Sequence, residues 1–176
     1  MRIASLAAVL LSASCTSSDP RLLESAQSYE SFGRVDGTRR WAPTDCKAPL
    51  PDPPRMSASR DSETHGRKLY HLYAKNREAY RLIHEFPQPV GQVVVKESWI
   101  PAAGSTFAKP VTGDRGPLFI MMKTGEPDSD DGWIYTTAAP DGSKITSWGK
   151  LASCMECHLS AKHDRLFGLT SCAAAK

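Results

Sequence analysis

The chain has 176 residues and a formal net charge of +3, with 40% hydrophobic and 23% charged residues. These values are typical of a folded domain of ordinary size and argue against a wholly disordered chain. No basic run is interleaved with aromatic residues, so a nucleic-acid partner is not expected.

Residues 1–14 have the pattern of a signal peptide: Arg2 is followed by an apolar run and then by small residues. The run is too short to span a bilayer by itself. The small residues before Cys15 resemble a lipoprotein cleavage site, although Ser12 stands where such sites usually carry leucine. Lipidation of Cys15 and ordinary cleavage both stay open. Either route predicts a periplasmic protein, and lipidation would anchor it to a membrane.

Residues 15–58 are interpreted as a Ser- and Pro-rich N-terminal tether and arm. Residues 16–36 are polar and weakly patterned, which is typical of a tether. The prolines within residues 41–54 exclude a helix there. Cys46 lies in this arm and Cys172 lies near the C-terminus. In an oxidising compartment this pair predicts a disulfide, and two unrelated thiols are the alternative.

Residues 59–176 are predicted to form one folded domain. At its start, apolar residues at helical spacing predict helices over residues 66–73 and 76–84. The histidines of this part are more typical of surface or capped positions than of metal ligands. They are His65, His71 and His84.

Three strands are predicted after these helices. The β-branched run at residues 93–95 begins a strand that continues to residue 100. A second strand covers residues 118–123 and a third covers residues 133–137. An acidic turn at residues 125–132 joins the last two strands into a hairpin.

The C-terminal part contains two thiols separated by two residues and followed directly by a histidine: Cys154, Cys157 and His158. This spacing is the attachment signature of a c-type haem, because each thiol adds to one porphyrin vinyl group and the histidine then lies under the iron. A redox-active pair should open a helix after a strand in a βαβ pattern, and a zinc site needs a second ligand pair. Neither is visible. The sequence therefore predicts one covalently bound haem c, with His158 as the axial iron ligand and a helix over residues 152–166.

The position of the motif narrows the class of cytochrome. A small class-one cytochrome c carries its motif near the N-terminus and a methionine ligand downstream, whereas no methionine follows His158. The four-helix cytochromes c′ carry a late motif but are helical throughout. The predicted fold class is α+β, with a mostly antiparallel β-sheet and a few helices packed around one c-type haem and the motif on a C-terminal helix.

Between residues 64 and 169 the chain resembles the cytochrome P-460 family and the related β-type cytochromes c′. The resemblance depends on landmarks in a fixed order, from a tyrosine-bearing helix through a Val-Lys-Glu strand and a Trp-x-Tyr strand to the haem motif and a final Ala-Lys-x-Asp-x-x-Phe. They are Tyr80, Phe86-Pro87, Gly91, Val93 to Glu97, Trp133, Tyr135 and Ala161 to Phe167.

The resemblance implies an open distal iron site, hydroxylamine or a related small nitrogen compound as substrate, and a redox partner cytochrome. It also implies a role for Lys96, because the lysine of the Val-Lys-Glu strand is bonded to a porphyrin meso carbon in that family. Strand alternation places Val94, Lys96 and Ser98 on one face. A lysine that points inward costs desolvation free energy unless it is paired with an opposite charge or covalently bonded. The alternative to the haem-facing role is a surface lysine in an ion pair.

Two other functions stay open: a nitric-oxide-binding protein like the β-type cytochromes c′, and an electron-transfer cytochrome with a methionine as second axial ligand. A homodimer also stays open. The candidates to line the distal pocket are Phe119, Met121 and Met122. Glu97 and the acidic residues between positions 126 and 131 are candidates for a distal proton acceptor.

Overall fold

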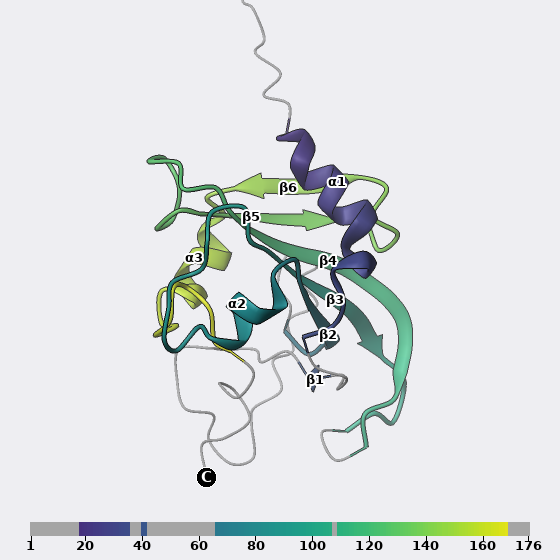
Figure 1. The fold of residues 1–176 in the computed structure, drawn as a ribbon. Coiled ribbons are helices and arrows are strands. Elements are labelled where there is room, and N and C mark those ends of the chain that lie inside the picture. The colour runs from purple at the N-terminus through teal and green to yellow at the C-terminus, as the bar shows by residue number, and fades with distance from the viewer. Residues whose placement is uncertain (1–17, 36–39, 42–65, 107–108, 169–176) are drawn as a thin grey trace, which may run out of the picture.

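The computed structural model describes residues 18–35, 40–41, 66–106 and 109–168. Figure 1 shows a strongly curved sheet in which the central strands are the longest. No helix within the described ranges is long and apolar enough to cross a membrane.

Several sequence predictions fall on residues that the structure does not describe. They include the signal peptide, lipidation of Cys15 and the disulfide between Cys46 and Cys172. His65 and most of the Pro-rich arm also lie outside the described residues. These expectations stay predictions.

The fold is built on one antiparallel sheet, in which each strand pairs with the next strand in sequence. This arrangement confirms the predicted α+β class, and the hairpin between the second and third predicted strands is present. The strands are β1 (Arg40–Trp41), β2 (Leu69–Ala74), β3 (Val93–Pro101), β4 (Thr112–Lys123), β5 (Trp133–Ala138) and β6 (Ile145–Gly149).

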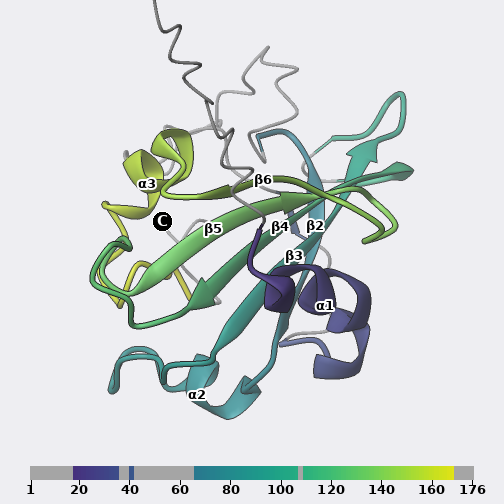
Figure 2. The ribbon, with the colours of Figure 1, turned by 90° about the horizontal axis from the view of Figure 1, so that it is seen from above.

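Both faces of the sheet are covered by helices. The helices are α1 (Pro20–Ser28), α2 (Arg77–Arg81) and α3 (Ala152–His158). Val93 and Val95 of β3 point to the side of α1, called here the α1 face, whereas Val94 points to the side of α2 and α3, called the α3 face. Figure 2 shows α1 and α3 on opposite sides of the sheet. The predicted alternation in β3 is therefore confirmed.

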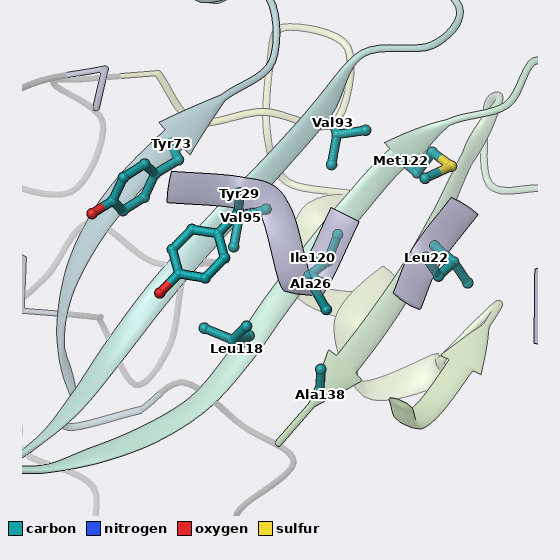
Figure 3. Packing of buried hydrophobic residues seen from close by; sticks show 10 residues of the cluster. All are labelled: Leu22, Ala26, Tyr29, Tyr73, Val93, Val95, Leu118, Ile120, Met122 and Ala138. Atoms are coloured by element: carbon teal, nitrogen blue, oxygen red, sulfur yellow. The ribbon is translucent and has the colours of Figure 1, made fainter. Parts of the chain in front are cut away.

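Helix α1 packs against the sheet, so the tether predicted for residues 16–36 is wrong over this segment. The Asp19 side chain accepts a hydrogen bond from the Arg21 amide, and Pro20 occupies the first turn, where its missing N–H costs nothing. Leu22 and Ala26 lie on one side of the helix and are buried in the α1-face core (Figure 3). Polar residues outnumber these apolar ones, so the hydrophobic periodicity of the segment is too weak to predict the helix.

A glycine permits the close approach of α1 to the turn between β5 and β6. Gly142 adopts a φ of +72°, and a methyl group at this position would overlap the carbonyl oxygen of Ala26. The turn can therefore lie directly under the helix only because residue 142 lacks a side chain.

The helix predicted over residues 66–73 is wrong, because this segment forms strand β2. Leu69 and Tyr73 face one side of the sheet and Leu72 the other, and all three are buried. A strand that is buried on both faces has no clear two-residue period, and its apolar residues can then fall at helical spacing.

Other boundaries differ from the prediction in extent. The helix expected over residues 76–84 is the shorter α2, and β4 begins six residues earlier than predicted, at Thr112 rather than Leu118. Strand β6 was not predicted. Helix α3 ends at His158 instead of residue 166, and the Ser160 hydroxyl donates to the Cys157 carbonyl where the helix stops.

We expect Gly142→Ala to destabilise the protein more than Gly104→Ala. Both glycines have left-handed φ values, +72° and +78°, so each substitution carries a backbone cost of about 1–2 kcal/mol. A Cβ at Gly104 meets nothing within 4 Å, whereas at Gly142 it displaces α1 and should add about 1–3 kcal/mol. Urea unfolding of both variants measures the difference. Equal losses would show that α1 does not rest on this turn.

Candidate haem site

Helix α3 places the two thiols of the motif beside the apolar α3 face. Cys154 and Cys157 are three residues apart, so they project from the same side of the helix, and both are partly exposed. Cys154 packs with Leu151 and Met155 against the core of this face. The thiols are thus accessible to modification while lying next to a surface suited to an apolar ring.

His158 is buried at the end of α3, and its hydrogen bond determines its tautomer. Its Nδ1 lies 2.6 Å from the Arg165 carbonyl oxygen, with 6% of the residue exposed. A carbonyl oxygen only accepts, so Nδ1 carries the proton, and in the neutral ring Nε2 keeps its lone pair. This is the arrangement by which metal-binding histidines are usually oriented.

The surroundings of His158 keep the imidazole neutral. Burial and the positive charge of Lys96 together lower the pKa of His158 to about 4, although the hydrogen bond to Arg165 partly opposes them. A neutral imidazole is the form that binds a metal. The rings of Tyr135 and Phe167 each lie 5.4 Å from the imidazole ring, centroid to centroid, and pack against it.

Strand register identifies the residues that share the α3 face with His158. Residues that pair directly across antiparallel strands project to the same side, and Lys96 pairs with Phe119 while Val94 pairs with Met121. Phe119 and Met121 therefore lie on this face, as the pocket prediction requires. Met122 projects to the opposite face and is buried in the α1-face core, so its assignment to the pocket is wrong.

Lys96 is half-buried and lies on the side of His158. Its Nζ is 4.9 Å from the centroid of the Tyr70 ring, and its charge contributes to the lowered pKa of His158. The side chain thus projects onto the α3 face, as alternation predicted.

The sequence interpretation missed a second lysine on the α3 face. Lys68 is buried, and its Nζ lies 5.7 Å from the centroid of the Phe119 ring. Lys68 precedes β2 and alternates with Tyr70 and Leu72. Recognition of β2 as a strand would have placed it correctly.

Glu97 lies on the α1 face, so its role as a distal proton acceptor is wrong. Its carboxylate accepts hydrogen bonds from the hydroxyls of Tyr29 and Tyr73 at 3.0 and 3.1 Å, and from the Arg115 guanidinium at 2.6 Å. His71 lies 3.4 Å from the same carboxylate, on the side of the sheet away from the motif. These four partners surround the buried Glu97 carboxylate, and the pairing of His71 with Glu97 across β2 and β3 places both on the face away from the thiols.

The acidic turn divides into an exposed and a buried part. Asp128 is exposed and pairs with Lys150 at 2.7 Å. Asp130 is buried. Its carboxylate accepts a hydrogen bond from the Tyr135 hydroxyl at 2.7 Å and forms an ion pair with Arg165 at 2.9 Å. Asp130 therefore belongs to the surroundings of His158.

The described residues fit a c-type haem. Two accessible thiols lie one helical turn apart, a neutral buried histidine directly follows the second, and Val94, Met121 and Tyr135 form an apolar surface beside them. Such a surface suits the porphyrin plane, and the protonated Nδ1 leaves Nε2 as the donor to iron.

The family model described as cytochrome P460 matches residues 54–167. The chain belongs to the cytochrome P460 family. No curated protein matches it. The matched residues include the motif and Lys96, and membership makes haem the expected cofactor of this P460-family protein.

In this cytochrome P460 family member, we expect Glu97→Gln to lower stability and to leave the haem spectrum unchanged. The substitution weakens hydrogen bonds to a buried charged group, which should cost about 1–3 kcal/mol. Glu30→Gln is the matched control, because Glu30 shares Arg115 but its side chain is 67% exposed. Urea unfolding and absorption spectra of both variants test the expectation. A shifted haem spectrum in folded Glu97→Gln would contradict the assignment to the α1 face.

Proposed function

We propose that this protein is an exported monohaem c-type cytochrome that oxidises hydroxylamine or a related small nitrogen compound. The observation that carries the proposal is that Lys96 reaches the same face of the sheet as His158 and acts on its pKa. Lys96 stands at the position of the cross-linking lysine in the Val-Lys-Glu strand. Cytochrome P460 family membership supports the haem and the reaction class.

The chain's own residues would bind and orient the cofactor. Cys154 and Cys157 would hold haem c through two thioether bonds, and His158 Nε2 would ligate the iron. When bound, the haem supplies an iron that takes electrons from the substrate and passes them to a redox partner cytochrome. Phe119 and Met121 add apolar surface on the same face, which limits the access of water.

Lys96 is proposed to form a covalent bond from Nζ to a porphyrin meso carbon. Formation of this bond would remove one hydrogen from the amine and one from the carbon, as two protons and two electrons. A peroxide-class oxidant would accept these electrons and be reduced to water. The product amine is no longer an ammonium ion, so its desolvation cost largely disappears.

Export is part of the proposal, because c-type haem is attached outside the cytoplasm in bacteria. The N-terminal signal pattern supports a periplasmic location, with lipidation of Cys15 as a route to a membrane anchor. A homodimer is compatible with the proposal but is not required by it.

A second candidate function is reversible binding of nitric oxide. Phe119 is buried and pairs directly with Lys96 in the sheet, so an aromatic ring lies on the face where a distal ligand would bind. An apolar aromatic surface suits an uncharged diatomic gas. Met121, on the same face, would be the axial ligand in the electron-transfer alternative. A low-spin ferric spectrum would favour that alternative, and a high-spin spectrum would favour an open site.

We expect the wild-type protein, expressed in the bacterial periplasm, to exceed its processed polypeptide mass by one haem. The double variant Cys154→Ala, Cys157→Ala should lose this added mass, because both thioether bonds are absent. Intact-mass spectrometry under denaturing conditions makes the measurement. Retention of haem by the double variant would refute covalent attachment at the motif.

We expect Lys96→Ala to keep its haem, to regain an ordinary c-type spectrum and to lose hydroxylamine oxidation. The thioether bonds remain, whereas the bond that alters the ring electronics is gone. Lys96→Arg is the matched control, since it keeps a positive charge but lacks a deprotonatable amine, and it should behave like Lys96→Ala.

Peptide mass spectrometry of the wild type tests the bond directly, since the haem peptide should contain Lys96. A free Lys96 with persistent hydroxylamine turnover would refute the cross-link. A free Lys96 without turnover would favour the nitric-oxide-binding function.

A further inference from the structure

The segment after α3 makes a tight turn through two consecutive left-handed residues. Asp164 and Arg165 have φ values of +49° and +60°, and the Leu166 amide donates to the His163 carbonyl at 2.8 Å. Left-handed backbone is unfavourable for side chains other than glycine and persists where surrounding contacts hold it. Contacts made by Asp164 and Arg165 must therefore hold the turn in this conformation.

Asp164 is held by three donors from three separate segments. Its carboxylate accepts the Gln88 amide at 2.6 Å, Lys123 Nζ at 2.5 Å and Trp133 Nε1 at 3.0 Å, and only 8% of its side chain is exposed. Lys123 and Trp133 pair with each other at the end of the β4–β5 hairpin. The first residue of the turn is thus fixed to the rigid end of the sheet.

Arg165 is held from the other side. Its guanidinium forms an ion pair with Asp130 at 2.9 Å, and Asp130 also accepts a hydrogen bond from the Tyr135 hydroxyl. Tyr135 in turn packs against the His158 ring. Two buried carboxylates therefore fix the two central residues of one turn.

The backbone carbonyl of Arg165, in this turn, accepts the hydrogen bond from His158 Nδ1. We propose that Asp164, together with Asp130, is a positioning residue of the haem site: it fixes the Arg165 carbonyl and so sets how strongly His158 donates electrons to iron. The inference rests on the proposed haem attachment. Both carboxylates would act through the Arg165 carbonyl, and neither is among the proposed iron ligands.

The physical link is the strength of the Nδ1–H···O bond. A short, well-aligned bond makes the imidazole a stronger donor, stiffens the iron–histidine bond and favours the ferric state. If the turn loosens, this bond lengthens. The iron–histidine stretching frequency of the ferrous protein should then fall, and the reduction potential should rise.

Asp164→Asn is the first test, made on the holoprotein. Asparagine tolerates left-handed backbone, so the turn itself remains accessible, but the charge-assisted bonds to Lys123 and the Gln88 amide weaken. Resonance Raman spectroscopy should show a lower or broadened iron–histidine band, and redox titration a higher potential. Asp128→Asn is the matched control, because it removes the same charge from an exposed pair with Lys150 and should leave the band unchanged.

Charge alone could raise the potential, because Asp164→Asn leaves Lys123 without its carboxylate partner. Trp133→Phe separates the two effects, since it removes one hydrogen bond to Asp164 without a change in charge. It also covers the case in which Asp164→Asn does not fold. A lower iron–histidine frequency in Trp133→Phe supports the positioning role.

An unchanged band in folded Asp164→Asn or in Trp133→Phe overturns the inference, as does an equal shift in Asp128→Asn. Denaturing mass spectrometry is run on every variant. Loss of the haem mass from the wild type would count against the proposed function itself, whereas an attached haem with an unmoved band counts only against the role of Asp164.

Discussion

The structure depends on the burial of strand β3 on both faces. Lys96 and Glu97 are neighbours in sequence, yet the two-residue period of the strand sends them to opposite sides of the sheet. Glu97 is hydrogen-bonded within a network of tyrosines and Arg115, whereas Lys96 lies on the face of His158. A slip of one residue in the β3 register would exchange the two charges and bury each without its partners.

The two faces differ in how they are stabilised. The α1 face is covered by apolar side chains of α1 and by the hydrogen-bond network of Glu97, so it forms a closed hydrophobic core. The α3 face is covered by two short helices and by a turn that ion pairs hold. Polar contacts specify one geometry more narrowly than apolar packing does, which suits the face that must orient an imidazole.

Sequence reasoning succeeded where the signal was local. The alternation of β3 needs only adjacent residues, and the structure sends Val94 and Val95 to opposite faces of the sheet. It failed at β2, whose two buried faces hide the strand period, and at α1, whose apolar residues are few.

Long-range contacts lay beyond any local pattern. Lys123 and Asp164 are 41 positions apart, and Trp133 and Asp164 are 31 apart. Met122 and Glu97 both lie on the face away from the motif, and membership of a strand does not by itself say which side the motif will cover. The final Ala-Lys-x-Asp-x-x-Phe landmark contained Asp164, but its partners are visible only in the folded chain.

The order of the strands has a consequence for how the chain folds. Every strand pairs with its neighbour in sequence, so the sheet can grow by successive closures of neighbouring strands, and the connections from β3 to β6 are short. The motif follows β6, after every strand of the sheet. A chain that emerges N-terminus first on the far side of a membrane would therefore have all six strands available before its two thiols appear, and the cofactor would meet an apolar platform already assembled.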